Sequence, residues 1–75
     1  MSLGESIKLV RQKALYTQES FAKELHVALS TVNRWEMDKA RPNISAMKNI
    51  KAFCVANNIS YKEVESKWLG KHEED

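Results

Sequence analysis

The sequence predicts an all-α fold, a compact bundle of five short helices in one domain spanning residues 1–75. Three observations support this class. Apolar residues recur at helical spacing in five separate segments, and strand-like alternation is nearly absent. Only two glycines and one proline occur in 75 residues, so few positions interrupt a helix. The composition, 43% apolar and 29% charged, is typical of a folded domain rather than a disordered chain.

The first helix is expected at about residues 3–13. Ser2 and Glu5 stand three positions apart at its start, which is the spacing of a capping box. Apolar residues then recur every three or four positions and define the face that packs inward. These residues are Leu3, Ile7, Val10 and Ala14.

The second helix is expected to begin after Thr17, a residue type that caps helix N-termini well. Tyr16 precedes the cap and can pack on Phe21 as a hydrophobic staple. Helical spacing then predicts that Phe21, Ala22 and Leu25 are buried. The periodicity breaks at 26–28, which indicates a short turn.

A third helix follows that turn, with different chemistry on its two faces. Ala28, Val32 and Trp35 recur on one side, which should pack inward. The opposite side is mostly polar and should face solvent. Two helices joined by so short a turn are typical of a helix-turn-helix unit, whose second helix fits the DNA major groove. The outward residues are Leu29, Ser30, Asn33, Arg34 and Met37.

The segment 37–42 should be a loop, because it ends in Pro42 and the residue before a proline disfavours helical conformation. Asn43 is expected to cap a fourth helix at about 44–57, with Ser45 as a rival cap. Its inward line contains Met47, Ile50, Cys54 and Asn57, flanked by Ala46 and Phe53.

The fifth helix is expected at about 61–69. Ser60 and Glu63 have capping-box spacing, with Ile59 and Val64 at the staple positions, and Gly70 suits a helix end. Its inward residues are Tyr61, Val64 and Trp68. These helices would give a core of about 3–69, followed by a charged tail, 70–75.

Charge distribution and cysteine content indicate the kind of partner and the cellular compartment. The net charge is +2, but the charges are unevenly distributed. Residues 1–56 contain nine basic and five acidic residues, whereas residues 57–75 contain three basic and five acidic residues. The basic part includes the helix-turn-helix unit, a mild sign of nucleic-acid binding. Cys54 has no partner for a disulfide or a zinc site and should lie in the core. With no leader or apolar span, we expect a cytoplasmic protein without metal or cofactor.

Five short motifs follow one another between Leu15 and Pro42: Thr17-Gln18-Glu19, Phe21-Ala22, Thr31-Val32, Trp35-Glu36 and Arg41-Pro42. In these motifs and their spacing the chain resembles the Cro and phage-repressor helix-turn-helix, the Xre-like family of lambda-repressor-like domains. The resemblance covers about residues 4–69 and implies a DNA-binding regulator, with repression favoured over activation. It also implies a homodimer on a palindromic operator of double-stranded DNA.

The resemblance implies a role for each residue that stands at a functional position of the family. It implies that Gln18, Lys39 and Arg41 contact phosphate. It also implies an ion pair between the helix 1 arginine, Arg11, and the glutamate that ends the recognition helix, Glu36. The base-facing residues would be Leu29, Ser30, Asn33 and Arg34, of which Arg34 suits guanine and Asn33 suits adenine.

Four positions depart from the family pattern. His26 and Asp38 stand where glycine is common, and both types tolerate the left-handed conformation better than most. Ala28 replaces the usual hydroxyl cap of the third helix. Leu29 is apolar where a polar reader is usual, so it suits either a thymine methyl group or a partner other than DNA.

Two other classes of function compete with DNA binding. A protein-interaction module on the same fold, antitoxin-like or an adaptor, would use Leu29 and Met37 as apolar anchors. A hydrolase rests only on two S-x-x-K spellings, at 20–23 and 45–48, in a chain too short for a deep cleft. We therefore expect no enzyme activity.

Overall fold

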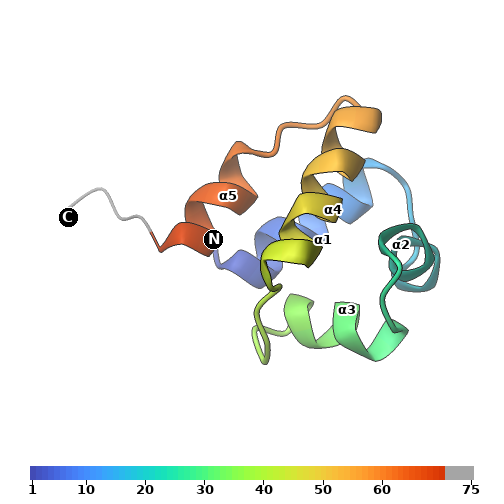
Figure 1. Ribbon diagram of the computed structural model, residues 1–75, viewed down its shortest axis with the longest axis horizontal. Coiled ribbons are helices and arrows are strands. Elements are labelled where there is room, and N and C mark those ends of the chain that lie inside the picture. Colours follow the sequence, from blue (N-terminus) through green and yellow to red (C-terminus); the bar gives the residue numbers. More distant parts are fainter. Residues whose placement is uncertain (71–75) are drawn as a thin grey trace.

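The computed structural model describes residues 1–70 and contains five α-helices, with no strand in that range (Figure 1). The all-α prediction is thus confirmed, and the bounds of all five helices fall within a residue or two of those expected. The charged tail lies mostly at 71–75, outside the described residues. The helices are α1 (Leu3–Lys13), α2 (Gln18–Leu25), α3 (Leu29–Glu36), α4 (Ile44–Ala56) and α5 (Lys62–Leu69).

The helices surround one core. α1 packs against α3 and α5, whereas α2 packs against α3 and α4, so α2 lies at the end of the molecule away from α5, and α3 runs from α2 back toward the α5 side (Figure 1). Phe53 joins two parts of this core, because its ring meets Tyr16 and Phe21 edge-on, with centroid distances of 5.0 and 4.9 Å. The fully buried side chains of the core include Ile7, Phe21, Leu25, Val32, Ile50, Cys54 and Val64.

Four helices end in the same way without glycine. A residue in the left-handed conformation follows each of α1 to α4, and the next backbone N–H then donates to a carbonyl five residues earlier, as in Tyr16 to Arg11 at 3.1 Å. This is the Schellman pattern, which usually uses glycine. The left-handed residues are Leu15, His26, Asp38 and Asn58. The expected tolerance of His26 and Asp38 is confirmed.

Gly4 permits a close crossing of two helices. A Cβ atom at this position would lie 2.4 Å from the Trp35 carbonyl oxygen, which is closer than atoms approach without bonding. The Gly4 N–H also donates to Asp38 Oδ1 at 2.8 Å. The start of α1 is therefore held against the end of α3, and this fixes one end of the predicted recognition helix.

Three local predictions were wrong. α5 begins at Lys62 after Tyr61, without a side-chain cap; the Ser60 hydroxyl accepts only from the Lys62 N–H at 3.3 Å, so no capping box forms. Asn57 was expected to face inward, but it is exposed and ends α4, where its side chain donates to the Phe53 carbonyl at 2.9 Å. Ala28 is exposed because it precedes α3 as the N-cap residue.

Other expectations hold. Asn43 rather than Ser45 caps α4, since its Oδ1 accepts from the Ala46 N–H at 2.8 Å. Gly70 ends α5 in the left-handed conformation. Cys54 is buried, and this burial raises the pKa of its thiol.

None of the helices in residues 1–70 combines the length and the apolar character needed to cross a membrane.

Candidate nucleic-acid interface

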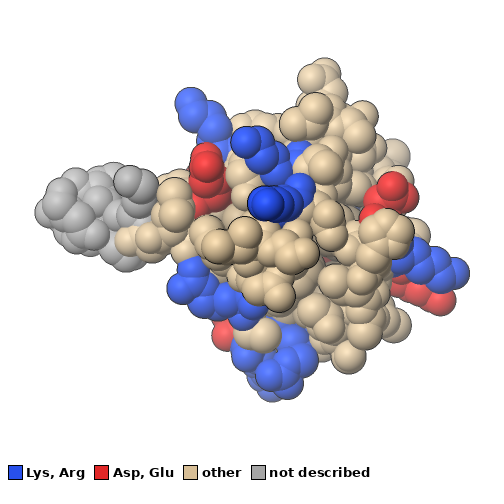
Figure 2. Space-filling view, viewed as in Figure 1, with Lys and Arg blue, Asp and Glu red and all other residues tan. Residues whose placement is uncertain are grey.

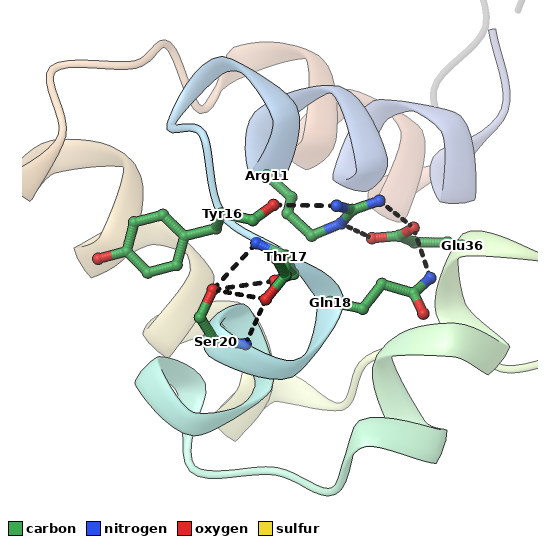
Figure 3. Close-up of polar contacts among 6 residues, drawn as sticks. All are labelled: Arg11, Tyr16, Thr17, Gln18, Ser20 and Glu36. Atoms are coloured by element: carbon green, nitrogen blue, oxygen red, sulfur yellow. Dashed lines mark hydrogen bonds and ion pairs between the residues drawn. The ribbon is translucent and has the colours of Figure 1, made fainter.

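The start of α2 is fixed by a reciprocal pair of hydroxyl residues (Figure 3). Thr17 Oγ1 accepts from the Ser20 N–H at 3.0 Å, and Ser20 Oγ accepts from the Thr17 N–H at 3.0 Å. Serine thus takes the part that glutamate or glutamine takes in the usual capping box. The sequence predicted the Thr17 cap but not its reciprocal partner.

The turn between α2 and α3 is stabilised by backbone and side-chain contacts. His26 adopts the left-handed conformation, with φ of 60°, and the Val27 N–H donates to the Ala22 carbonyl at 3.0 Å. From α4, Asn49 Nδ2 donates to the Leu25 carbonyl at 3.3 Å. These contacts determine the direction in which α3 leaves the turn.

α3 presents the two faces expected from the sequence. Val32 and Trp35 are buried in the core, while the outward side chains stand in solvent. The N-terminus of α3 has no side-chain cap, because the N-cap residue is Ala28 and a methyl group cannot accept a hydrogen bond. A rigid inner face therefore supports an exposed outer face. The exposed residues are Leu29, Ser30, Asn33, Arg34 and Met37.

A buried charge network holds the end of α3 against α1 and α2 (Figure 3). Arg11 donates through Nε to Glu36 Oε2 at 2.7 Å and through Nη2 to Glu36 Oε1 at 3.0 Å. Arg11 Nη1 also donates to the Tyr16 carbonyl at 3.0 Å. The Arg11–Glu36 pair expected from the family resemblance is thus present and bidentate, the strong geometry for such pairs.

Gln18, expected at phosphate, belongs to the same network. Its Nε2 donates to Glu36 Oε1 at 2.9 Å, and its side chain is partly buried (Figure 3). The amide group carries a second hydrogen, and the first turn of a helix has backbone N–H groups without intrahelical acceptors. Gln18 therefore keeps donors for an anion while one hydrogen anchors it to Glu36.

The loop at 37–43 carries the other two expected phosphate ligands, and they differ in their contacts. Lys39 is exposed. Arg41 is also exposed, but its guanidinium donates to the Trp68 carbonyl and lies over the Trp68 ring, 5.7 Å from the centroid. Because the two residues are 27 positions apart in sequence, spacing along the chain could not reveal this contact.

A hollow of about 260 Å³ separates α3 from this loop and the start of α4. It brings Arg34 of the expected base-reading set and Arg41 of the expected phosphate set to one concave surface. Its lining residues are Val27, Thr31, Arg34, Trp35, Ala40, Arg41, Asn43 and Ala46.

Basic side chains gather where this loop lies. Figure 2 shows them along the lower edge of the view, over the end of α3 and the loop after it, and a second group in front of α4. An acidic side chain lies among them, but a mainly basic edge still attracts polyanions. The hydrogen-bond donors on the exposed face of α3 lie beside this edge and can meet base edges. The arrangement suits binding of double-stranded nucleic acid through α3.

Metal chemistry has no comparable support within residues 1–70. No group of three or more His, Cys, Asp and Glu side chains in that range could hold a metal ion.

Comparison with known proteins identifies this unit. Residues 7–54 match the Helix-turn-helix family, of the Cro/C1 type. The chain is similar to the HTH-type transcriptional activator BcrR of Enterococcus faecalis, with 32% identity over 53 residues. The alignment covers 71% of this chain and 26% of BcrR, so the chain spans about a quarter of that relative. No solved structure matches the chain.

Proposed function

Because the chain belongs to the helix-turn-helix family of DNA-binding transcription regulators, we propose that it reads a specific operator by placing α3 in the major groove. The observation that carries this proposal is the division of α3 into a buried face and a solvent-exposed polar face. An α-helix fits the major groove, where each base pair presents a distinct pattern of donors and acceptors.

The exposed side chains suit particular base edges. Arg34 can donate two parallel hydrogen bonds to guanine, and Asn33 can both donate to and accept from adenine. Ser30 can donate or accept at the helix entry. Leu29, with 48% of its surface exposed, offers an apolar contact for a thymine methyl group.

Phosphate contacts would set the position of α3 along the duplex. We assign them to Gln18, Lys39 and Arg41, which flank α3 on both sides. Gln18 lies at the N-terminus of α2, where the helix dipole favours an anion. Such contacts position a protein without reading sequence.

We propose further that two copies bind a palindromic operator, with half-sites about one helical turn apart, roughly 34 Å. Two copies double the number of base contacts that one short helix can make. A domain seated in the groove of a promoter blocks access by other proteins, which favours repression.

A second candidate is protein recognition through the same face. Leu29 and Met37 are 48% and 56% exposed on α3 and at its end. A patch of exposed apolar side chains can mark a protein-interaction site, and methionine is enriched at such interfaces. In this function α3 would bind a protein groove instead of DNA.

A titration of labelled duplex DNA, followed by anisotropy at increasing salt, tests the main proposal. With two cationic phosphate ligands, Lys39 and Arg41, in each of two subunits, affinity should fall on the order of 10²-fold between 50 and 200 mM salt, because the neutral Gln18 releases no counterion. Lys39→Ala should make this dependence less steep, because it removes one phosphate contact per subunit. Lys62→Ala, an exposed lysine on α5, is the matched control and should leave the dependence unchanged.

Two results would contradict the proposal. One is an absence of duplex binding at low salt. The other is an equal effect of Lys39→Ala and Lys62→Ala, because general basic charge rather than the α3 face would then account for binding. Recovery of one stoichiometric protein partner without DNA would support the second candidate.

A further inference from the structure

We propose that Trp68 is a positioning residue for DNA binding, which holds Arg41 in the geometry that meets phosphate. This inference rests on the proposed DNA binding and adds to it a role for the end of α5. Trp68 lies outside residues 7–54, the part of the chain that matches the family.

The first argument is the pair of contacts that cross between the two segments. Trp68 Nε1 donates to the Pro42 carbonyl at 2.7 Å. In the other direction, the Arg41 guanidinium donates to the Trp68 carbonyl and lies over the indole ring, 5.7 Å from its centroid. Trp68 thus holds two consecutive residues of the loop. It holds Pro42 by the backbone carbonyl and Arg41 by the charged side chain.

The second argument is the charge environment of Arg41. The Trp68 carbonyl belongs to the last turn of α5, and the C-terminal end of a helix favours a cation. A stacked guanidinium is also attracted by the negative face of the indole ring. Both effects restrict a long side chain that would otherwise sample many rotamers, so less conformational entropy is lost when phosphate binds.

The third argument is that Arg41 remains usable while it is held. A guanidinium has five N–H donors, and Arg41 is still exposed to solvent. It lines the same hollow as Arg34 on α3. By fixing Arg41, Trp68 therefore fixes the position of a phosphate ligand relative to a base reader.

A purely structural role for Trp68 is the competing explanation, because its ring also packs against the core. A double-mutant cycle in DNA affinity separates the two roles, since coupling through Arg41 disappears once Arg41 is removed. The proteins needed are the parent chain, Trp68→Phe, Arg41→Ala and the double variant. Trp68→Phe keeps an aromatic ring but loses the N–H that holds Pro42.

The probe is a short mixed-sequence duplex at low salt, with circular dichroism used to confirm that each variant is folded at the titration temperature. Trp68→Phe should weaken binding about three- to tenfold in the parent chain, as expected for loss of one hydrogen bond and a less populated competent loop. With Arg41→Ala already present, the same change should alter affinity less than about twofold. Tyr61→Phe, which removes a hydroxyl at the other end of α5, should leave affinity unchanged.

An equal loss of affinity from Trp68→Phe in both backgrounds would overturn the inference, and so would no loss in either. If the parent chain fails to bind any duplex, the proposed function itself fails, and this inference fails with it. Should Trp68→Phe unfold, Trp68→Tyr replaces it in the same double-mutant cycle, because it also keeps an aromatic ring and loses the indole N–H. The inference then predicts the same pattern, weaker binding in the parent chain and less than about twofold change beside Arg41→Ala, and an equal loss in both backgrounds would overturn it.

Discussion

At the scale of single residues, the Glu36 carboxylate connects three helices. It ends α3, pairs with Arg11 of α1 and accepts from Gln18 of α2, and only 3% of its side chain is exposed. A buried charge pair of this kind adds little net stability over apolar packing, but removal of one partner leaves the other charge unpaired. Its value here is that it fixes the orientation of α3.

Glu36→Ala should therefore destabilise the fold. Arg11 would stay partly buried without its carboxylate, and the free energy of unfolding should fall by about 3 kcal/mol. Urea unfolding monitored by circular dichroism measures this change. A small domain has only about 5–15 kcal/mol of stability in total, so the effect should be plain.

Glu63→Ala is the matched control. Glu63 meets Lys67 at 3.9 Å on an exposed face of α5, and such surface pairs contribute less than about 1 kcal/mol. If Glu36→Ala costs no more than Glu63→Ala, the buried network does not stabilise α3.

The site was partly foreseeable at this scale. The Arg11–Glu36 pair followed from family resemblance, and the outward position of Asn33 and Arg34 followed from helical periodicity. The contacts of Gln18 with Glu36 and of Arg41 with Trp68 did not. They join residues distant in sequence, and neither spacing nor composition records which distant side chains meet.

At the scale of elements, the helix ends are unusual because α1 to α4 stop at residues other than glycine. Leu15 is the clearest case, since its φ is 63° and 92% of its surface is exposed. The left-handed conformation costs a residue with a side chain roughly 1–2 kcal/mol. The Leu15 side chain regains little of this through burial.

Leu15→Gly should stabilise the protein. Glycine adopts the left-handed conformation freely but loses more backbone entropy on folding, so the net gain should be about 0.5–1 kcal/mol in the free energy of unfolding. Thermal and urea unfolding both measure it. Leu15→Ala keeps the backbone strain and should change stability little. A loss of stability on Leu15→Gly would show that the leucine side chain, not the backbone, matters at this turn.

The elements themselves were predictable because apolar periodicity depends on the same burial that forms the core. The start of α5 also lies within one residue of the expected one, but the capping of that start was wrong. Ser60 and Glu63 have the spacing of a capping box, yet the chain enters the helix only after Tyr61, whose ring packs on the core. Capping-box spacing therefore located the start of the helix but not the residue that precedes it, and Tyr61 packs on the core without capping α5 by its side chain.

At the scale of the whole molecule, the fold serves to hold α3 from behind. Gly4 and Asp38 tie its end to α1, Glu36 ties it to Arg11 and Gln18, and its inner face closes the core. The loop after α3 is held by Trp68 of α5. All five helices thus contribute to the position of one exposed surface.

The central claim is that the exposed face of α3 reads base sequence, and selection of binding sites from random duplex DNA tests it most directly. The parent chain should enrich one two-fold symmetric motif with half-sites about 10 base pairs apart. Arg34→Ala should enrich the same motif with the preference for guanine lost at one position in each half-site, whereas Lys39→Ala should keep the full motif at lower affinity. Enrichment of no motif by the parent chain, or of an identical motif by Arg34→Ala, would contradict the account.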